Sequence, residues 1–405
     1  MQDIKYVKNE KFHTTLINFI YQFKCDKQEL MSITILSKLL NKTNSLYKEE
    51  SIFQKEKLNR YIINYNCSLQ SINDVYFINF SLLIPNNNII DDSNLKKQIL
   101  FLLDTIYNTN LNDDILFNKE KKLYIEILLN NYKNIDFIAE KEVLDLLDNE
   151  CLFNKIKYKD IENIQRLNKL DVINSYNKFI KNIMPKIFIN GNIDIKECTN
   201  IISDYISDLN LKPYKIIQKY NKFYINNDFI EKKDISKYYQ SIIYVVYNVK
   251  DYKEKDFYKL YLINLLLSSG SSGLLLSILR KKSNLVYTAS SYSMLKNGLL
   301  FIKASTEKRN IDLCLLMIKE LINDLNNIDK YKENINNIVT KLELEKEREL
   351  DNFYITSNDV VNEYFKTDIK TSDEIEIIKN ISLDELKNFV TRLNIVCQYV
   401  LKGDL

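Results

Sequence analysis

The sequence predicts an α+β protein with two homologous domains, each a mainly antiparallel sheet covered by helices. The length of 405 residues exceeds what one hydrophobic core usually organises, so two domains are expected. Only 5 glycines and 3 prolines are present, which disfavours turn-dense all-β folds. Strand-like and helix-like segments also recur in the same order in the two halves of the chain, and this order predicts the domain pair.

The repeat begins with a strand. Thr15–Lys24 (TLINFIYQFK) and Ser241–Lys250 (SIIYVVYNVK) are β-branched and aromatic runs of strand length, and they correspond position by position. Each is followed by a charged break and an apolar helical stretch. Biased use of Ile, Asn, Lys and Tyr could also create such likeness, but the conserved order favours duplication. Two further strand pairs continue the repeat: those that start at Asn73 and Asn297, and those that end at Gly191 and Gly403.

Apolar residues at helical spacing predict the helices that cover the sheets. A polar stretch rich in Lys and Asn at residues 211–237 is the predicted linker, and it separates an N-terminal domain (1–210) from a C-terminal domain (238–405). The predicted helices are Asn94–Tyr107, Asn118–Tyr132, Ile161–Ile180 in two pieces and Ile195–Leu209, then Ile311–Leu325, Tyr331–Asn352 and Leu383–Leu393.

Charge and hydropathy exclude several classes of partner. The net charge of +3 is too small to predict binding to nucleic acid. No apolar run reaches the roughly 18 residues of a membrane span, and the first residues lack an apolar signal core. We therefore expect a cytoplasmic protein without a membrane span. Six scattered cysteines without a C-x-x-C pair are interpreted as buried thiols in a reducing compartment: Cys25, Cys67, Cys151, Cys198, Cys314 and Cys397.

The chain contains a single histidine, His13. This count disfavours a zinc-hydrolase or Ser/His type of catalytic site built from this chain alone. His13 precedes a predicted strand and is interpreted as a surface or packing residue. We expect no metal site and no cofactor in this chain, so any hydrolytic chemistry would need groups from a partner.

The most informative stretch runs from Leu265 to Thr306. A small-residue loop, Ser268–Gly273, allows close backbone approach, and its serines are suited to cap the next helix. A short helix, Leu274–Lys281, leads into a strand and then into the Asn297-Gly298 hairpin turn. The loop lacks the Lys-Ser/Thr ending of a phosphate loop, so nucleotide binding is not expected.

This order of loop, L-R-x-K-x-x-L-x-Y and hairpin resembles the second domain of the insulinase/pitrilysin-like metallopeptidases, the inverzincins. It is most similar to the short bacterial type, which consists of two half-size subunits. FHTTLINFIYQF resembles the opening strand of that family and QYVLKGDL its closing strand. The resemblance implies an α/β roll in each domain, and it places Arg280 and Tyr287 on the family's arginine-tyrosine pair, which grips the substrate backbone.

The zinc motif of this family, H-x-x-E-H, is degenerate here. Registering it on Leu39–Thr43 places Ile33, Leu36 and Ser37 at the first histidine, the glutamate and the second histidine. These residues offer neither zinc ligands nor a general base. The resemblance therefore implies a non-catalytic subunit, with zinc and the general base in a homologous H-x-x-E-H partner and a peptide as the substrate.

The remaining pair has a physical rationale. Arginine presents a permanently charged planar fork and tyrosine a phenolic donor, so Arg280 and Tyr287 could hold a peptide carbonyl together. The structural alternative is that Arg280 caps a helix C-terminus and that Tyr287 is one of 28 tyrosines filling a sheet. Two alternatives to the peptidase-subunit hypothesis stay open: an assembly scaffold of the same fold without a role in proteolysis, and a peptide-binding chaperone that acts alone.

Overall fold

The protein is described by a computed structural model, which covers residues 4–86, 89, 93–147, 156–213, 216–217, 228–269, 273–349, 351–365 and 374–404. Within these ranges no helix combines the length and the apolar composition that a membrane crossing requires. The chain forms two compact units. The first comprises Met1–Asn130, Lys155–Asn221 and Phe353–Thr367, and the second comprises Asn131–Asn154, Lys222–Asn352 and Asp368–Leu405.

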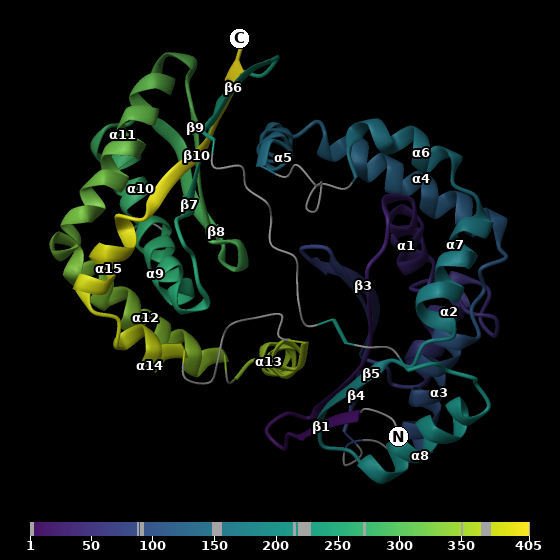
Figure 1. Cartoon of the computed structure of the whole chain (residues 1–405). Coiled ribbons are helices and arrows are strands. Elements are labelled where there is room, and N and C mark those ends of the chain that lie inside the picture. Colours follow the sequence, from purple (N-terminus) through teal and green to yellow (C-terminus); the bar gives the residue numbers. More distant parts are fainter. Residues whose placement is uncertain are drawn as a thin grey trace. The chain divides into compact units, whose positions relative to one another are not determined.

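The first unit is built on a five-stranded mixed sheet (Figure 1). One outer strand pairs in parallel with its neighbour, and the other three pairs are antiparallel. The strand order is β1 (Ile4–Lys8), β5 (Lys186–Gly191), β2 (Thr14–Phe23), β4 (Val75–Pro85) and β3 (Asn64–Ile72).

The second unit repeats this topology strand for strand. Its order is β6 (Ile230–Ser236), β10 (Leu393–Gly403), β7 (Ser241–Val249), β9 (Leu299–Thr306) and β8 (Val286–Met294), with β6 and β10 parallel. The three repeated strands of the sequence thus occupy equivalent places: β2 and β7, β4 and β9, β5 and β10. The predicted fold class, two homologous α+β units with mainly antiparallel sheets, is confirmed. Strand β6 lies inside the stretch that the sequence suggested as a linker.

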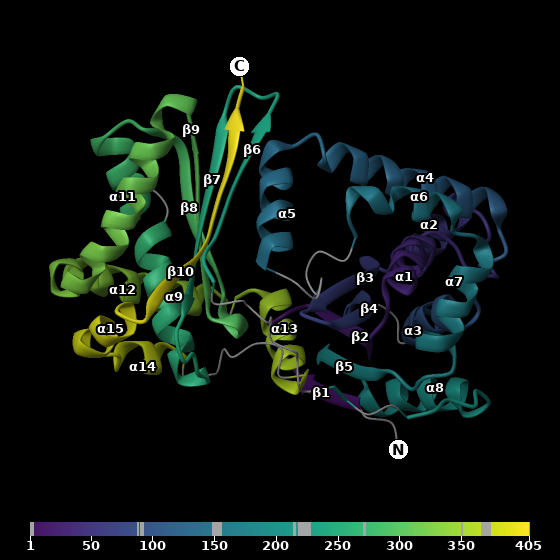
Figure 2. The same cartoon turned by 45° about the horizontal axis from the view of Figure 1, so that its top comes forward.

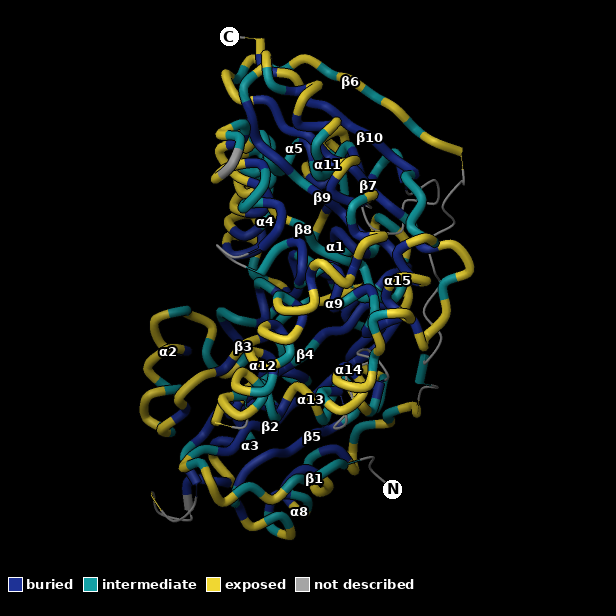
Figure 3. The backbone as a smooth tube through the Cα atoms, turned by 90° about the vertical axis from the view of Figure 1, so that its left-hand side faces the viewer, coloured by how far each residue is buried: buried dark blue, intermediate teal, exposed yellow. Residues whose placement is uncertain are grey.

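Both central strands are apolar on both faces. Because successive side chains of a strand point to opposite faces, Ile17 and Tyr21 of β2 join the main core of the first unit, whereas Ile20 belongs to a second cluster on the other face. In β7, Val245 likewise joins the main core of the second unit, and Tyr244 belongs to a cluster on the other face. Figure 3 shows these strands as buried, while the outer strand β6 alternates between exposed and half-buried residues.

Helices of the first unit pack on one face of its sheet and enclose the main core. The first of them, α1, begins with a capping box in which the Asp26 side chain accepts from the Glu29 amide and Glu29 accepts from the Asp26 amide. The helices are α1 (Lys27–Leu39), α2 (Glu50–Asn59), α3 (Ser93–Tyr107), α4 (Asp114–Asn131), η1 (Tyr158–Asp160), α6 (Ile161–Arg166), α7 (Lys169–Tyr176), η2 (Asn177–Lys181) and α8 (Ile195–Ser207).

Helices of the second unit follow the same plan. The helix that the sequence predicted over Leu383–Leu393 ends at Val390, since β10 starts at Leu393. The helices are η3 (Glu254–Asp256), α9 (Phe257–Ser268), α10 (Leu274–Leu276), η5 (Ser277–Lys282), η6 (Leu295–Asn297), η7 (Lys308–Asn310), α11 (Ile311–Asp324), η8 (Leu325–Tyr331), α12 (Lys332–Glu349), α14 (Glu374–Lys379) and α15 (Leu383–Val390).

The other face of each sheet carries a helix from the opposite half of the chain. Helix α5 (Ile135–Leu147) belongs to the second unit and runs beside its sheet (Figure 2). Its residues Ala139 and Val143 pack with Tyr244 and Tyr399. Helix α13 (Phe353–Phe365) belongs to the first unit. Phe365 at its end packs against Phe77 and Phe188, with ring centroids 5.4 and 5.8 Å away. The two units therefore exchange equivalent helices.

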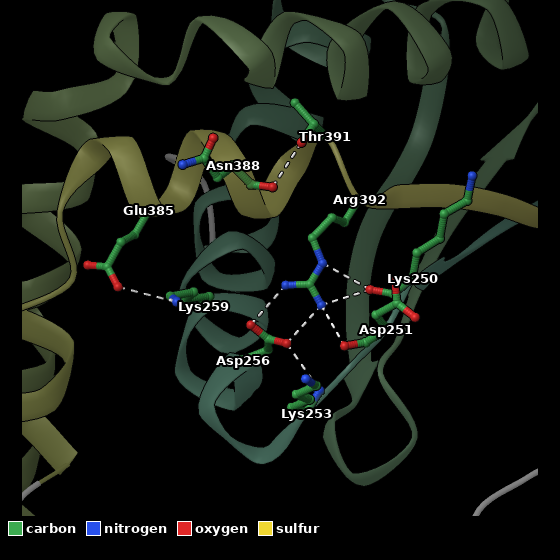
Figure 4. A network of polar contacts seen from close by, with 9 residues as sticks. All are labelled: Lys250, Asp251, Lys253, Asp256, Lys259, Glu385, Asn388, Thr391 and Arg392. Carbon is green, nitrogen blue, oxygen red and sulfur yellow. Dashed lines mark hydrogen bonds and ion pairs between the residues drawn. The ribbon is translucent and has the colours of Figure 1, made fainter.

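An arginine fastens the start of β10 within the second unit (Figure 4). Arg392 donates to both carboxylate oxygens of Asp256, at 3.0 and 2.8 Å, and to the backbone carbonyls of Lys250 and Asp251. Asp256 is almost fully buried, and it also accepts from the amide of Lys253. The turn after β7 and the last strand are thus joined by one side chain.

Candidate functional site

The three positions that the sequence analysis assigned to a degenerate zinc motif lie on α1. Ile33 and Leu36 are fully buried, and both belong to the hydrophobic core of the first unit. Ser37 is also buried, and its hydroxyl donates to the carbonyl of Thr34 at 2.9 Å, a contact within the helix. The turn of α1 that would carry metal ligands is therefore used for packing.

This donor set does not fit zinc. Zinc sites in proteins use thiolate, imidazole or carboxylate ligands, and two aliphatic side chains with one hydroxyl supply none. Across the described residues, no group of three or more His, Cys, Asp or Glu side chains is arranged to hold a metal ion. His13, the only histidine of the sequence, is exposed just before β2. No metal chemistry can be derived from the side chains at these positions.

Arg280 lies in the short helical segment that precedes β8. The chain there passes from α10 into the π-helical turn η5, and Arg280 is exposed on that turn. Its backbone carbonyl accepts from the amide of Asn284 at 2.9 Å, while Asn284 adopts a left-handed φ of 50° that ends the helix. No described residue forms an ion pair or hydrogen bond with its guanidinium, which leaves the donors available.

Tyr287 is the second residue of β8, on the outer edge of the sheet. It is the extra residue of a β-bulge, since Val286 pairs with Thr306 and Thr288 with Ser305. A bulge of this kind redirects a side chain relative to the regular alternation. Tyr287 is 38% exposed, so it does not fill the sheet as the structural alternative suggested.

Two residues that the sequence reasoning missed lie beside this tyrosine. The Tyr287 hydroxyl donates to Oε1 of Glu307 at 3.3 Å, and Oε2 of Glu307 pairs with Nε of Arg309 at 2.7 Å. Partial desolvation, followed by the negative charge of Glu307, raises the pKa of Tyr287 above its usual value. The phenol therefore stays protonated and keeps its donor near neutral pH.

The loop before this segment differs from the prediction in one respect. The N-cap residue of α10 is Gly273 rather than a serine, and it makes no side-chain hydrogen bond to the helix. A Cβ on Gly273 would lie 2.7 Å from the carbonyl oxygen of Leu267, which confirms the close backbone approach. Ser268 instead accepts from the amide of Ser291 in β8 at 3.0 Å. Residues 270–272 lie outside the described ranges.

The four buried cysteines that the structure describes are poorly placed to react. Burial raises the pKa of Cys198 and of Cys397 to about 12, and it raises that of Cys67 further. Cys314 is buried and Cys25 is half-buried, in line with the interpretation as packing thiols. Cys151 lies outside the described residues.

Arg280 and Tyr287 are therefore the two predicted site residues that the structure leaves exposed. Both belong to the second unit, at the entry of β8, and no hydrogen bond or cation–π contact links their side chains. A fixed positive charge and a neutral phenolic donor suit a carbonyl oxygen, because the arginine adds charge and the phenol adds direction. The chain itself supplies neither a nucleophile nor a metal ligand at these positions.

Residues 166–349 match the model of a protein family described as the peptidase M16 inactive domain. The matched segment contains Arg280 and Tyr287 but not the motif positions on α1. No curated protein matches the chain.

Solved structures show the same fold over nearly the whole chain. A conserved protein from Enterococcus faecalis V583 is 17% identical, with a TM-score of 0.87 and coverage of 99% of this chain and 96% of that one. A protease from Helicobacter pylori is 13% identical, with a TM-score of 0.76 and coverage of 98% and 96%. A chain of complex III2 from Candida albicans is 12% identical, with a TM-score of 0.70 and coverage of 99% and 93%.

Proposed function

We propose that this chain, which is of the peptidase M16 inactive-domain type over residues 166–349, is the non-catalytic subunit of a heterodimeric zinc metallopeptidase of the cytoplasm. A homologous H-x-x-E-H subunit would carry the zinc and the general base. This chain would close the chamber around a peptide substrate and present Arg280 and Tyr287 to it. One contrast supports the proposal: the motif positions Ile33 and Leu36 are buried in the core, whereas the arginine-tyrosine pair is accessible.

The two side chains would bind the substrate backbone in different ways. The free guanidinium of Arg280 offers a permanent charge and several parallel donors to one or two carbonyl oxygens. The Tyr287 hydroxyl at present makes a long hydrogen bond to Glu307, at 3.3 Å, which a closer acceptor on a substrate could replace. Donors aimed at an oxygen that gains negative charge during peptide cleavage stabilise the transition state more than the ground state.

Removal of the arginine tests this role. The chain is combined with an H-x-x-E-H homologue encoded beside it, and hydrolysis of a fluorogenic peptide is followed with either subunit alone and with both. We expect cleavage from the pair only. Arg280→Ala should lower the rate by about 10², the loss typical of one donor to a developing oxyanion.

A matched variant controls for general damage. Arg348→Ala removes another exposed arginine of the second unit and should leave the rate unchanged. An unaltered rate in Arg280→Ala contradicts the gripping role, and cleavage by the partner alone at the full rate contradicts the subunit proposal. The isolated chain should also contain no stoichiometric zinc by elemental analysis.

A second candidate is an assembly scaffold without a role in proteolysis. The likeness in fold to a chain of complex III2 from Candida albicans favours it, since the resemblance of the sequence extends to family members in respiratory complexes that serve as structural parts. Purification of the tagged chain with its native partners distinguishes the two. An H-x-x-E-H protein in stoichiometric amount supports the peptidase subunit, and a stable complex without one supports the scaffold.

A further inference from the structure

A cavity of about 220 Å³ lies within the first unit, between α13 and the sheet face that this helix covers. Its floor is apolar and rigid, because Ile20, Phe77 and Phe365 are all buried residues of a small cluster on that face. Its rim is polar. The other lining residues are Gln70, Ser71 and Ile72 of β3 and its end, Asn79 of β4, and Asn358, Val361 and Asn362 of α13.

One polar atom of this cavity has no partner. Oδ1 of Asn79 is buried and accepts no hydrogen bond. Buried polar atoms are paired in the great majority of native proteins, so an orphaned acceptor costs folding free energy unless something outside the chain supplies a donor. Asn79 lines the pocket, but Oδ1 itself has almost no accessible surface, so a donor in the pocket reaches this atom only after the amide group has turned toward it.

The polar lining carries no charge. Amide and hydroxyl groups line the pocket, and among the described residues that line it there is no Asp, Glu, Lys or Arg. A charged ligand would lose its hydration there without gaining a counter-ion. Amide side chains instead pair with the N–H and C=O groups of another amide, and the apolar floor suits a hydrocarbon side chain.

The volume fits one residue. An apolar cavity of about 150 Å³ holds benzene, so 220 Å³ accommodates a leucine- or phenylalanine-sized side chain with part of its peptide unit. Complete ligand sites of soluble proteins usually exceed about 300 Å³. The pocket is therefore of the size that takes one side chain of a longer molecule.

Helix α5, the equivalent helix of the second unit, has charged rather than amide side chains along its edge. Asp136 of α5 pairs with Lys303 at 2.7 Å, and Glu142 pairs with Lys232 at 2.9 Å. The rim of α5 is thus closed by ion pairs to its own sheet, whereas amides form the rim under α13. The amide rim distinguishes the first unit from its repeat.

We propose that the pocket under α13 binds one uncharged, apolar residue of a peptide. The side chain lies on Phe77 and Phe365, and the peptide N–H donates to Oδ1 of Asn79 once the amide group of Asn79 has turned toward the pocket. The peptide nature of the ligand rests on the function proposed above, but the site is separate from Arg280 and Tyr287, and its binding can be measured on this chain alone.

The test uses the full chain with labelled Ile, Leu and Val methyl groups, observed by NMR. The probes are the N-acetyl methylamides of leucine, phenylalanine, aspartate and lysine. Leucine and phenylalanine probes should shift the methyl signals of Ile20, Ile72 and Val361 in a saturable manner. The two charged probes should bind at least tenfold more weakly, because the lining offers no counter-charge.

Two variants test the polar contact. Asn79→Leu should weaken the leucine probe about fivefold, the worth of one lost hydrogen bond, while its urea midpoint stays equal or rises since the unpaired amide is gone. Asn66 is an exposed asparagine of the neighbouring strand β3, and Asn66→Leu should leave both the probe affinity and the urea midpoint unchanged. If Asn79→Leu does not fold, Asn358→Ala, which removes an exposed rim amide of α13, should still weaken the probe two- to threefold.

The outcomes separate this site from the proposed function. Methyl signals that do not respond, equal binding of charged and apolar probes, or an unchanged affinity in the pocket variants overturn the pocket, even when cleavage by the subunit pair depends on Arg280. Conversely, saturable and selective probe binding that Arg280→Ala leaves unaltered supports the pocket, even when the subunit pair shows no peptidase activity.

Discussion

At the residue scale, the half-buried Arg392 forms an ion pair of good geometry with the buried carboxylate of Asp256. The guanidinium contacts both carboxylate oxygens and two backbone carbonyls, so its donors are well used. Burial alone would raise the pKa of Asp256, but the hydrogen bonds and charge of Arg392, with the Lys253 amide, outweigh it and lower that pKa. A buried charge that is paired this well becomes costly once its partner is removed.

Arg392→Ala should therefore lower the free energy of unfolding by about 3–5 kcal/mol, the usual cost of stranding one member of a buried pair. Arg392→Lys, which keeps the charge but loses the bidentate fork, should cost less. Urea denaturation at pH 7 measures both. The effect depends on pH, because a carboxylate with a lowered folded pKa stabilises the protein above its unfolded pKa of about 4 and loses this contribution as the pH falls.

Arg348→Ala serves as the matched control, since Arg348 is exposed in the same unit. Equal stabilities of Arg392→Ala and Arg348→Ala at pH 7 would contradict the assignment of Arg392 as a structural anchor.

The same scale shows what spacing along a sequence can predict. A local sequence motif predicts Arg280 and Tyr287 as site residues, and the structure leaves both side chains accessible. Glu307 and Arg309 were not predicted, because they approach Tyr287 only through the β8–β9 hairpin and the bulge that offsets its register. Such contacts depend on strand pairing, which no local pattern of these residues specifies.

At the scale of elements, α1 is a helix whose residues Ile33 and Leu36 are devoted to the core. Both are buried in the hydrophobic core of the first unit, so histidine or glutamate at these positions would place a polar group among hydrocarbons. Such a substitution should therefore cost stability.

Ile33→His should lower the free energy of unfolding by about 2–4 kcal/mol, since it removes a fully buried aliphatic group and buries a polar ring. The urea midpoint of the variant, with and without zinc, provides the measurement. Lys38→His on the same helix, at a half-buried position, should change it little. If zinc raised the urea midpoint of Ile33→His, the assignment of this position to the core alone would be contradicted. Such a rise would require further zinc ligands near α1, and no cluster of three or more metal-ligand side chains is present among the described residues.

The long helices were predictable from their apolar spacing, but α5 and α13 were not. Helices α5 and α13 follow directly after other helices, and the apolar faces that they present are short. Residues such as Val360 and Val361 have only modest helix propensity. Each of these helices is stabilised by packing on a sheet formed by the other half of the chain, so the information that decides it is distant in sequence.

At the scale of the whole molecule, the duplication explains both the success and the limit of sequence reasoning. The apolar runs of β2 and β7 predict strands, and in the structure both strands are covered on both faces. They do not indicate which segment covers the second face. Contiguous halves are the simplest interpretation of a repeat, whereas the folded units interleave three segments each.

Many tyrosines and thiols are buried in both units, and together they make stability sensitive to alkaline pH. Burial raises the pKa of Tyr107 and of Tyr124 to about 12, and that of Cys198 and of Cys397 to a similar value. In the unfolded chain phenols titrate near pH 10 and thiols near pH 8.5. At a pH between the unfolded and the folded pKa of such a group, the unfolded chain has lost a proton that the folded chain still holds.

The free energy of unfolding should therefore fall as the pH rises above about 9, because the number of protons bound in the unfolded state is then smaller. Each such group contributes about 1.4 kcal/mol per pH unit between its two pKa values. Urea midpoints measured by circular dichroism from pH 8 to 11 at constant ionic strength test this slope. Lysines titrate in the same range, so a difference between variants isolates the phenols.

Tyr124→Phe removes one buried phenol, and its unfolding free energy should decline less steeply than that of the unmodified chain between pH 10 and 12, by about 1.4 kcal/mol per unit. Tyr61→Phe removes a phenol that is 57% exposed, and it should retain the original slope. Parallel slopes for the unmodified chain and Tyr124→Phe would show that this phenol loses its proton equally in the folded and unfolded states. Burial would then not govern its protonation, and the alkaline sensitivity would have to come from the lysines.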